Sequence, residues 1–172
     1  MKHKTTFFIL LSLVALVQAC ASTISINTAP QGAEAILTES GGDKVINLGL
    51  TPLKTTVKAS GQYILSLDKT GFSPYRKNID LGKAGELNIE LVPVYEISID
   101  TQPSGANASI EDKGSAYVYN IGKTPVTYSI EGKGPFVLSV RMQGYETETA
   151  QLDTTPGKKQ VLKTVTLKPS GQ

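Results

Sequence analysis

The chain contains the same opening motif twice, and this internal repeat constrains its fold more than any other feature. Residues 24–33 (ISINTAPQGA) align with residues 97–106 (ISIDTQPSGA) at an offset of 73 residues. The offset continues without a gap as far as Tyr145, and roughly a third of the aligned positions are identical. The sequence therefore predicts two tandem units of one fold, at residues 23–92 and 95–168.

Beyond Tyr145 the register of the repeat slips by a few residues, so that Leu91 matches Leu167. A unit of about 70 residues can fold alone without a metal or a disulfide. The chain has a single cysteine, Cys20, which excludes an internal disulfide. Two small domains, each with its own hydrophobic core, are the expected organisation.

Each unit has the alternating pattern of β-strands with one buried face. Ile24, Ile26 and Thr28 alternate with polar residues, and the same alternation recurs from Ile97. Residues 63–68 repeat it in the first unit, and no window has sustained helical periodicity. We predict an all-β protein with about seven short strands per unit, packed as a small two-sheet sandwich.

Proline and glycine divide these strands at short intervals. Pro30 with Gly32, and Pro103 with Gly105, fit the second and fourth positions of a type I turn. The glycines at 71 and 144 lie between an apolar strand and an aromatic residue, where a short hairpin needs a positive φ.

Three short motifs occur once in each unit and in the same order. They are Pro-x-Gly-Ala at residues 30–33 and 103–106, Gly-x-Thr-Pro at 49–52 and 122–125, and Gly-aromatic at 71–72 and 144–145. This set resembles the PEGA domain family, although Gln31 and Ser104 stand where that family has glutamate. The resemblance implies immunoglobulin-like or prealbumin-like β-sandwiches that serve as structural or binding appendages of cell-envelope proteins, without catalytic residues.

The amino end has the pattern of a secretory signal. Lys2, His3 and Lys4 precede an apolar run at residues 7–17, which is shorter than the ~18–20 residues that a membrane-spanning helix needs. The alternative to the lipoprotein signal described next is a conventional signal of a soluble protein that has a free thiol nearby.

The run ends in residues 17–20 (VQAC), which resemble the lipobox of bacterial lipoproteins. That resemblance implies cleavage after residue 19 and acylation of Cys20, so that residues 1–19 are a signal peptide and residues 20–22 a lipidated tether. More than one acyl chain gives stable anchoring without a transmembrane helix. Ala21 and Ser22 follow the cysteine in place of an inner-membrane aspartate, which favours the outer membrane.

The charge balance of the chain argues against nucleic acid as a partner. Loss of Lys2 and Lys4 lowers the 17 basic residues to 15, which equals the 15 acidic ones. Basic residues are interspersed with acidic ones along the chain, so we expect no nucleic-acid binding.

The residue types also argue against an enzyme. The single histidine, His3, lies in the segment that is expected to be removed, and this leaves no imidazole for general-base catalysis or metal binding. An acylated Cys20 is no nucleophile. Acidic pairs such as Glu111 with Asp112 are adjacent in sequence and fit solvent-facing charge better than a hydrolase pair. We expect no catalysis, cofactor or metal.

Recognition by a surface is the remaining function. Tyr117 and Tyr119 place two aromatic rings on one face of a strand, and Tyr128 joins them if its strand is a neighbour. Such rings bind a protein partner or stack on a sugar, but they also cover the flank of a sandwich. The sequence favours a non-catalytic, membrane-tethered scaffold that binds an envelope protein. The alternative is a lipoprotein that binds peptidoglycan or surface polysaccharide.

Overall fold

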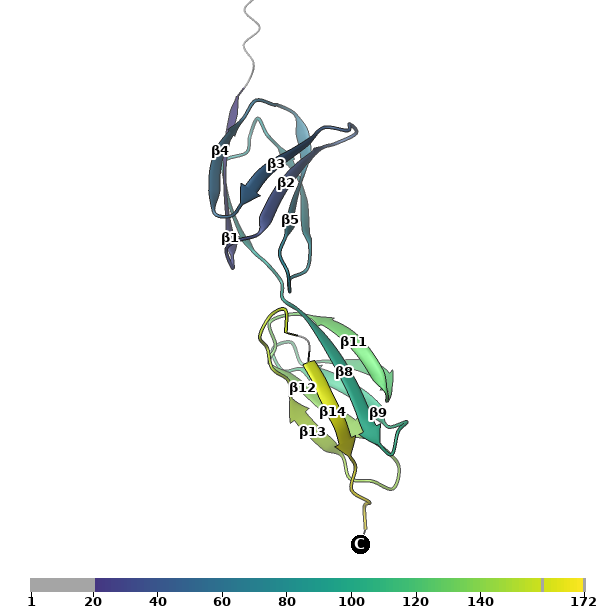
Figure 1. The fold of residues 1–172 in the computed structure, drawn as a ribbon. Helices are drawn as coiled ribbons and strands as arrows, with labels where there is room; N and C mark the ends of the chain where they lie inside the picture. The colour runs from purple at the N-terminus through teal and green to yellow at the C-terminus, as the bar shows by residue number, and fades with distance from the viewer. Residues whose placement is uncertain (1–20, 159, 172) are drawn as a thin grey trace, which may run out of the picture.

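The chain forms two all-β units that lie end to end. The structure is a computed structural model that describes residues 21–158 and 160–171, and within these residues there are fourteen strands and no helix. Figure 1 shows the two units stacked along one axis, with the carboxyl end at the far tip of the second. The predicted fold class, two small β-sandwiches in tandem, is confirmed.

The first unit has seven strands in two sheets. They are β1 (Ser22–Ala29), β2 (Glu34–Glu39), β3 (Val45–Leu50), β4 (Leu53–Val57), β5 (Gln62–Asp68), β6 (Tyr75–Asp80) and β7 (Glu86–Glu90). One sheet has the order β4-β1-β7 and the other β3-β2-β5-β6. β1 pairs with β4 antiparallel and with β7 parallel, so the opening strand is the centre of its sheet.

The second unit repeats this topology. Its strands are β8 (Val94–Gln102), β9 (Asn107–Asp112), β10 (Tyr117–Lys123), β11 (Val126–Glu131), β12 (Phe136–Arg141), β13 (Glu148–Gln151) and β14 (Gln160–Thr166). The sheets have the orders β11-β8-β14 and β10-β9-β12-β13.

The first strand starts two residues earlier than the alternation from Ile24 predicts. Ser22 pairs with Val57, and the Thr23 hydroxyl lies 3.2 Å from that of Thr56. Pairing with β4 therefore extends β1 into the expected tether of residues 20–22. Cys20 and the expected signal peptide lie outside the described residues.

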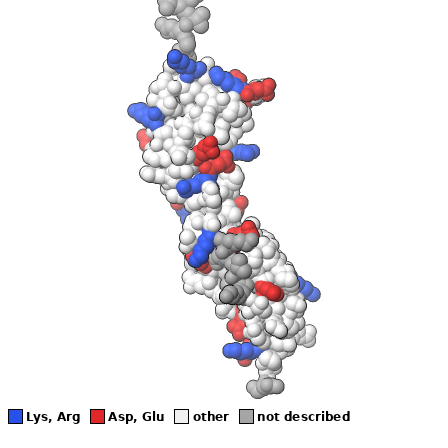
Figure 2. Space-filling view, viewed as in Figure 1, with Lys and Arg blue, Asp and Glu red and all other residues white. Residues whose placement is uncertain are grey.

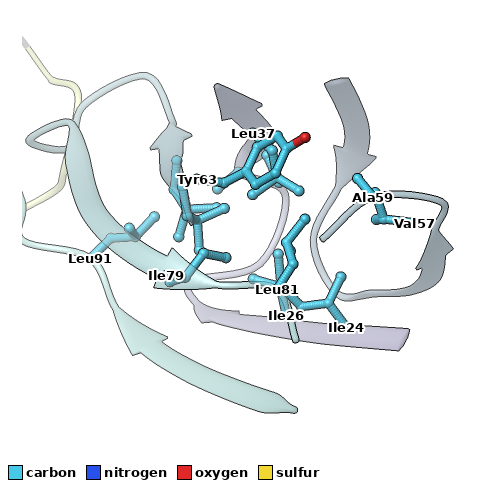
Figure 3. Close-up of a cluster of buried hydrophobic side chains, with 13 residues drawn as sticks. Ile24, Ile26, Leu37, Val57, Ala59, Tyr63, Ile79, Leu81 and Leu91 are labelled. Atoms are coloured by element: carbon cyan, nitrogen blue, oxygen red, sulfur yellow. The ribbon is translucent and has the colours of Figure 1, made fainter. Parts of the chain in front are cut away.

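The alternation of apolar residues produces one core in each unit. Ile24, Ile26, Leu65 and Leu67 are fully buried between the two sheets of the first unit, as predicted. Figure 3 shows these sheets meeting through aliphatic side chains, with the Tyr63 ring among them. The second core is made in the same way from Tyr95, Ile97, Ile99, Ile110, Phe136, Leu138 and Val140.

The turn after the first strand is held by a distant segment. A type I turn would close with Gly32 N–H donating to the Ala29 carbonyl. Instead, Gly32 N–H donates to the Thr51 carbonyl (2.7 Å), and Thr51 N–H donates to the Ala33 carbonyl (2.9 Å). The second unit has the same pair of bonds between Gly105, Ala106 and Thr124, so the hydrogen bond that would close a type I turn is replaced by a long-range bond in both units. The peptide bonds before Pro30, Pro52, Pro103 and Pro125 are cis.

Two further pairs of glycines, each with one member in either unit, also have structural roles. Gly49 and Gly122 have φ of 99° and 112° and follow register shifts in the β2–β3 and β9–β10 pairs. Gly71 and Gly144 have φ of 82° and 81° in the loops before β6 and β13, which confirms the positive φ predicted there.

Contacts join the two units at the short segment of residues 92–94. The Lys133 ammonium lies 2.5 Å from the Glu90 carboxylate, and the Ser73 hydroxyl donates to Glu131 (3.0 Å). Each pair joins a residue of the first unit to a residue of the second. The units therefore touch through side chains as well as through the connecting chain.

The offset between the two repeats increases near the carboxyl end, and the inserted residues contribute to this junction. The predicted match of Leu91 with Leu167 is confirmed, because their amides donate to Ala29 and Gln102, which are themselves one repeat apart. The offset is still 73 residues at Gln151 but has grown to 76 at Leu167. Part of this insertion lengthens the loop that carries Gly157, and a Cβ at Gly71 would lie 2.4 Å from the Gly157 nitrogen. The longer loop of the second unit therefore packs on the backbone of the first.

Candidate binding surfaces

The residues that the two units share have structural roles, and this narrows the search for a site. The Pro-x-Gly-Ala turn, the Gly-x-Thr-Pro segment and the Gly-aromatic loop each take part in backbone bonds that occur in both units. A surface that is specific to one unit must then come from residues that differ between the repeats. The tyrosines of β10 are such residues, because Lys44 and Ile46 occupy the equivalent positions in the first unit.

Tyr117 and Tyr119 contact each other but differ in exposure. Their ring centroids lie 4.7 Å apart in an edge-to-face arrangement with an interplanar angle of 68°. Tyr117 is 59% exposed, whereas Tyr119 is half-buried and packs against the core of the second unit. The pair therefore combines a ring that is anchored in the core with a ring that is open to solvent.

Tyr128 lies on a different sheet. It belongs to β11, which pairs with β8, while Tyr117 and Tyr119 belong to β10, which pairs with β9. Tyr128 is partly buried against the same core. Tyr117 and Tyr119 thus lie together on one strand, whereas Tyr128 lies on the other sheet.

Exposed apolar side chains gather on equivalent edge strands of the two units. Large exposed hydrophobic residues among the described part of the chain are Val45 and Leu50 on β3, Tyr117 and Val118 on β10, and Val92 at the junction. Both β3 and β10 are the outermost strands of four-stranded sheets. Edge strands carry unpaired backbone groups that another strand can pair with.

Sequence reasoning missed a second set of residues, on the outer face of the sheet β10-β9-β12-β13. Ser109, Ser139, Thr149 and Arg141 line a groove of about 260 Å³ there. A comparison of the two repeats could have indicated them, because Ile36 stands in place of Ser109 and Asp68 in place of Arg141.

Charged groups with shifted pKa values lie in loops that they themselves stabilise. The Lys158 ammonium and the Thr155 hydroxyl and amide lower the pKa of Asp153 to about 2. The Ser115 hydroxyl, with the amides of Gly114 and Ser115, lowers the pKa of Asp112. These carboxylates accept bonds from their own loops, and this arrangement stabilises the loops.

No metal site or spanning helix is found in the part of the chain that the structure describes. Residues 21–158 and 160–171 contain no group of three or more His, Cys, Asp or Glu residues that could hold a metal ion. They also contain no helix long and apolar enough to cross a bilayer. On the face shown in Figure 2, acidic and basic side chains are interspersed and separated by uncharged surface.

Comparison with known proteins identifies both units. The sequence profile described as the PEGA domain matches residues 21–94 and again residues 94–170. No curated protein matches the chain.

Solved structures show only distant likenesses. The TIE protein of Bacillus anthracis has 12% sequence identity and a TM-score of 0.37, over 87% of this chain and 34% of that protein. A DUF3823 family protein from Bacteroides ovatus has 11% identity and a TM-score of 0.33, over 81% of this chain and 100% of that protein. The chain thus spans about a third of the length of the Bacillus protein.

Proposed function

The chain belongs to the PEGA domain family, as two tandem copies, and from this premise we propose that it is a non-catalytic lipoprotein of the bacterial outer membrane. It acts as a scaffold or accessory subunit that binds another envelope protein. The first unit lies next to the membrane and serves as a spacer, and the second unit presents the binding surface.

The observation that carries the proposal is the exposed apolar surface of β10. Tyr117 and Val118 are 59% and 49% exposed on the outermost strand of their sheet. Burial of such side chains stabilises a complex, and tyrosine supplies a large contact area with little loss of side-chain entropy. A partner strand that pairs with the open edge of β10 would add backbone hydrogen bonds to this contact.

The anchor is supported by the sequence before the first strand. Residues 17–20 resemble a lipobox, and acylation of Cys20 would supply the chains needed for stable membrane binding. β1 begins at Ser22, so Ala21 alone separates the cysteine from the first unit. A chain extends at most ~3.3–3.6 Å per residue, so the first unit would lie directly on the lipid surface.

Membrane fractionation tests the anchor. The full chain, expressed in a diderm bacterium with labelled palmitate, is expected to carry the label and to sediment with the outer membrane. The Cys20→Ser variant is expected to lose the label and leave the membrane fraction. A wild-type chain that stays unlabelled and free of membranes contradicts the proposal.

Crosslinking in intact cells tests the binding surface. We expect the wild-type chain to capture a specific envelope protein and the Tyr117→Ser variant to lose most of that capture. Val45→Ser is the matched control, because Val45 is 61% exposed on the equivalent strand of the first unit. Equal loss in both variants, or no loss with Tyr117→Ser, would remove β10 from the proposal.

The glycan alternative assigns the same tyrosines to a sugar. Sedimentation with purified peptidoglycan distinguishes the two functions, since a protein-binding β10 leaves the chain in the supernatant. Pelleting of the wild-type chain that Tyr117→Ser abolishes would support the glycan function at this strand instead.

A further inference from the structure

The outer face of the sheet β10-β9-β12-β13 carries a row of hydroxyl groups. Ser139 on β12 lies directly opposite Ser109 on β9 and opposite Thr149 on β13. Adjacent strands are ~4.7–4.9 Å apart, which is comparable to the length of one sugar ring. Three hydroxyl side chains therefore extend across the sheet at regular intervals and line one groove.

The hydroxyl at the centre of this row has no partner. Ser139 Oγ is buried, and among the described residues it makes no hydrogen bond. Buried polar groups are almost always satisfied, and an unsatisfied one lowers the stability of the folded state. A ligand that brings a polar group to the floor of the groove would satisfy this hydroxyl and so gain affinity.

Arg141 gives one end of the groove a positive charge. It lies two residues from Ser139 on the same face of β12, it is exposed, and within the described part of the chain no ion pair to it is seen. Lys113 also lines the groove, but its ammonium is 2.6 Å from the Glu111 carboxylate. The uncompensated charge is therefore the planar guanidinium, which binds carboxylates through two parallel hydrogen bonds.

The same face of the first unit differs at three of these four positions. Ile36 replaces Ser109, Asp68 replaces Arg141 and Arg76 replaces Thr149, while Ser66 keeps the central serine. A carboxylate would be repelled by Asp68, and Ile36 removes one hydroxyl from the row. The first unit therefore keeps one hydroxyl of the row and carries its arginine at a different position.

We propose that the outer face of the sheet β10-β9-β12-β13 binds an acidic saccharide, with Arg141 on the sugar carboxylate and Ser109, Ser139 and Thr149 on the sugar hydroxyls. Hydroxyl side chains both donate and accept, as the hydroxyls of a sugar require. Val137 lies beside the row and offers apolar contact to the C–H groups of a sugar ring. Val118 of β10 also lines the groove, but Tyr117 is its neighbour in the strand and points to the opposite face, so the saccharide site does not need the tyrosines.

Binding of a galacturonic acid oligomer to the purified full-length chain tests the proposal. Calorimetry is expected to give saturable binding. The backbone amides whose NMR signals shift on binding, here called the affected amides, are expected to lie on β9, β12 and β13. The methyl-esterified oligomer keeps the sugar but loses the charge, and polyglutamate keeps the carboxylates but lacks the sugar, so both are expected to bind at least about tenfold more weakly.

Three variants identify the residues. Arg141→Asp and Ser109→Ile each introduce the residue found at the equivalent position of the first unit, where the same sheet accommodates it, and each is expected to weaken binding about tenfold or more. Ser139→Ala is expected to weaken binding without lowering the unfolding midpoint, because it removes a hydroxyl that has no partner in the free protein. Tyr117→Ser is expected to bind as the wild type does.

Several outcomes overturn the proposal. Equal binding of the esterified oligomer removes the role of Arg141, and equal binding of polyglutamate reduces the site to charge alone. Affected amides that lie in the first unit, or on β10 without any on β9, β12 or β13, place the ligand elsewhere. Absence of binding by the folded wild-type chain to the acidic oligomer rejects the site.

Discussion

Thr51 contacts Thr28 through their hydroxyl groups, whose oxygens lie 2.5 Å apart in the core of the first unit. The Thr28 hydroxyl donates to the Pro30 carbonyl (2.7 Å), so its single proton is used, and the Thr51 hydroxyl must be the donor between them. The Thr51 oxygen in turn accepts from Ala33 N–H (3.0 Å). This relay ties the Pro-x-Gly-Ala turn to the Gly-x-Thr-Pro segment.

Thr51→Val is expected to destabilise the first unit by about 1–3 kcal/mol. Valine keeps the shape but leaves Ala33 N–H without its hydroxyl acceptor and Thr28 without its donor, and a buried polar group left unsatisfied costs about this much. Urea unfolding followed by circular dichroism measures the loss, and hydrogen exchange at the Ala33 amide locates it. Thr38→Val, on the outer face of β2, is the control and is expected to change stability by less than about 0.5 kcal/mol.

The second unit allows the same experiment. Thr101 and Thr124 form the same relay, with Thr101 donating to Pro103 (2.8 Å) and Ala106 N–H donating to Thr124 (3.1 Å). Thr124→Val is therefore expected to cost about as much as Thr51→Val. A much smaller loss in either unit would show that water satisfies the freed amide.

The fold could be predicted because its signals are local or repeated. Ile24 with Ile26, and Leu65 with Leu67, alternate with polar residues, and this period alone identifies strands with one buried face. The closure of the turn at Gly32 could not be predicted, because its acceptor is the carbonyl of Thr51, which lies between β3 and β4 and is distant in sequence. Local turn chemistry favours a bond from Gly32 N–H to the Ala29 carbonyl, and the long-range bond to Thr51 replaces it.

The candidate sites depend on strand register, which the sequence does not specify locally. Whether Tyr128 joins Tyr117 depends on which sheet each strand enters, and the chain changes sheets between β10 and β11. The alignment of Ser109 with Ser139 needs the register of β9 against β12. A register change of one residue moves a side chain to the opposite face.

Asp153 is expected to stay ionised at a pH where ordinary carboxylates are protonated. Hydrogen bonds from Lys158 and Thr155 lower its pKa to about 2, against an unperturbed value of 3.8. Because the folded-state pKa is the lower one, the stabilisation is complete above the unfolded value and is lost as pH falls from about 4 through about 2. A carbon-13 titration of the carboxyl group measures this pKa directly.

Lys158→Met is expected to raise the pKa of Asp153 toward its ordinary value, since the Lys158 bond is the largest cause of the shift. Thr155→Ala is expected to raise it by less. An unchanged pKa in the Lys158→Met variant would contradict the ion pair between Asp153 and Lys158 in this loop.

The ion pair between Glu90 and Lys133 is expected to contribute little, although it joins the two units. Both side chains are more than half exposed, and exposed pairs stabilise by about 0–1 kcal/mol and are screened by salt. Glu90→Gln should leave the unfolding midpoint nearly unchanged, with any difference vanishing in concentrated salt. A loss that persists in high salt would indicate a hydrogen bond rather than a charge effect.

Backbone contact at Gly71 is expected to hold the relative orientation of the units, and the repeat supplies its own control. Gly71 and Gly144 have nearly the same φ, 82° and 81°, so alanine costs about 1–2 kcal/mol of backbone strain at both positions. A Cβ at Gly71 would lie 2.4 Å from the Gly157 nitrogen, whereas a Cβ at Gly144 would meet nothing within 4 Å. Only Gly71→Ala must therefore push the second unit away from the first.

Nitrogen-15 relaxation and small-angle X-ray scattering measure this difference. The wild type and Gly144→Ala should tumble as one elongated body, because the junction is intact in both. Gly71→Ala should shorten the rotational correlation time of each unit and broaden the distribution of distances between the units. Should Gly71→Ala tumble like Gly144→Ala, the orientation must be held by the chain at residues 92–94 and not by the packing of Gly157 on Gly71.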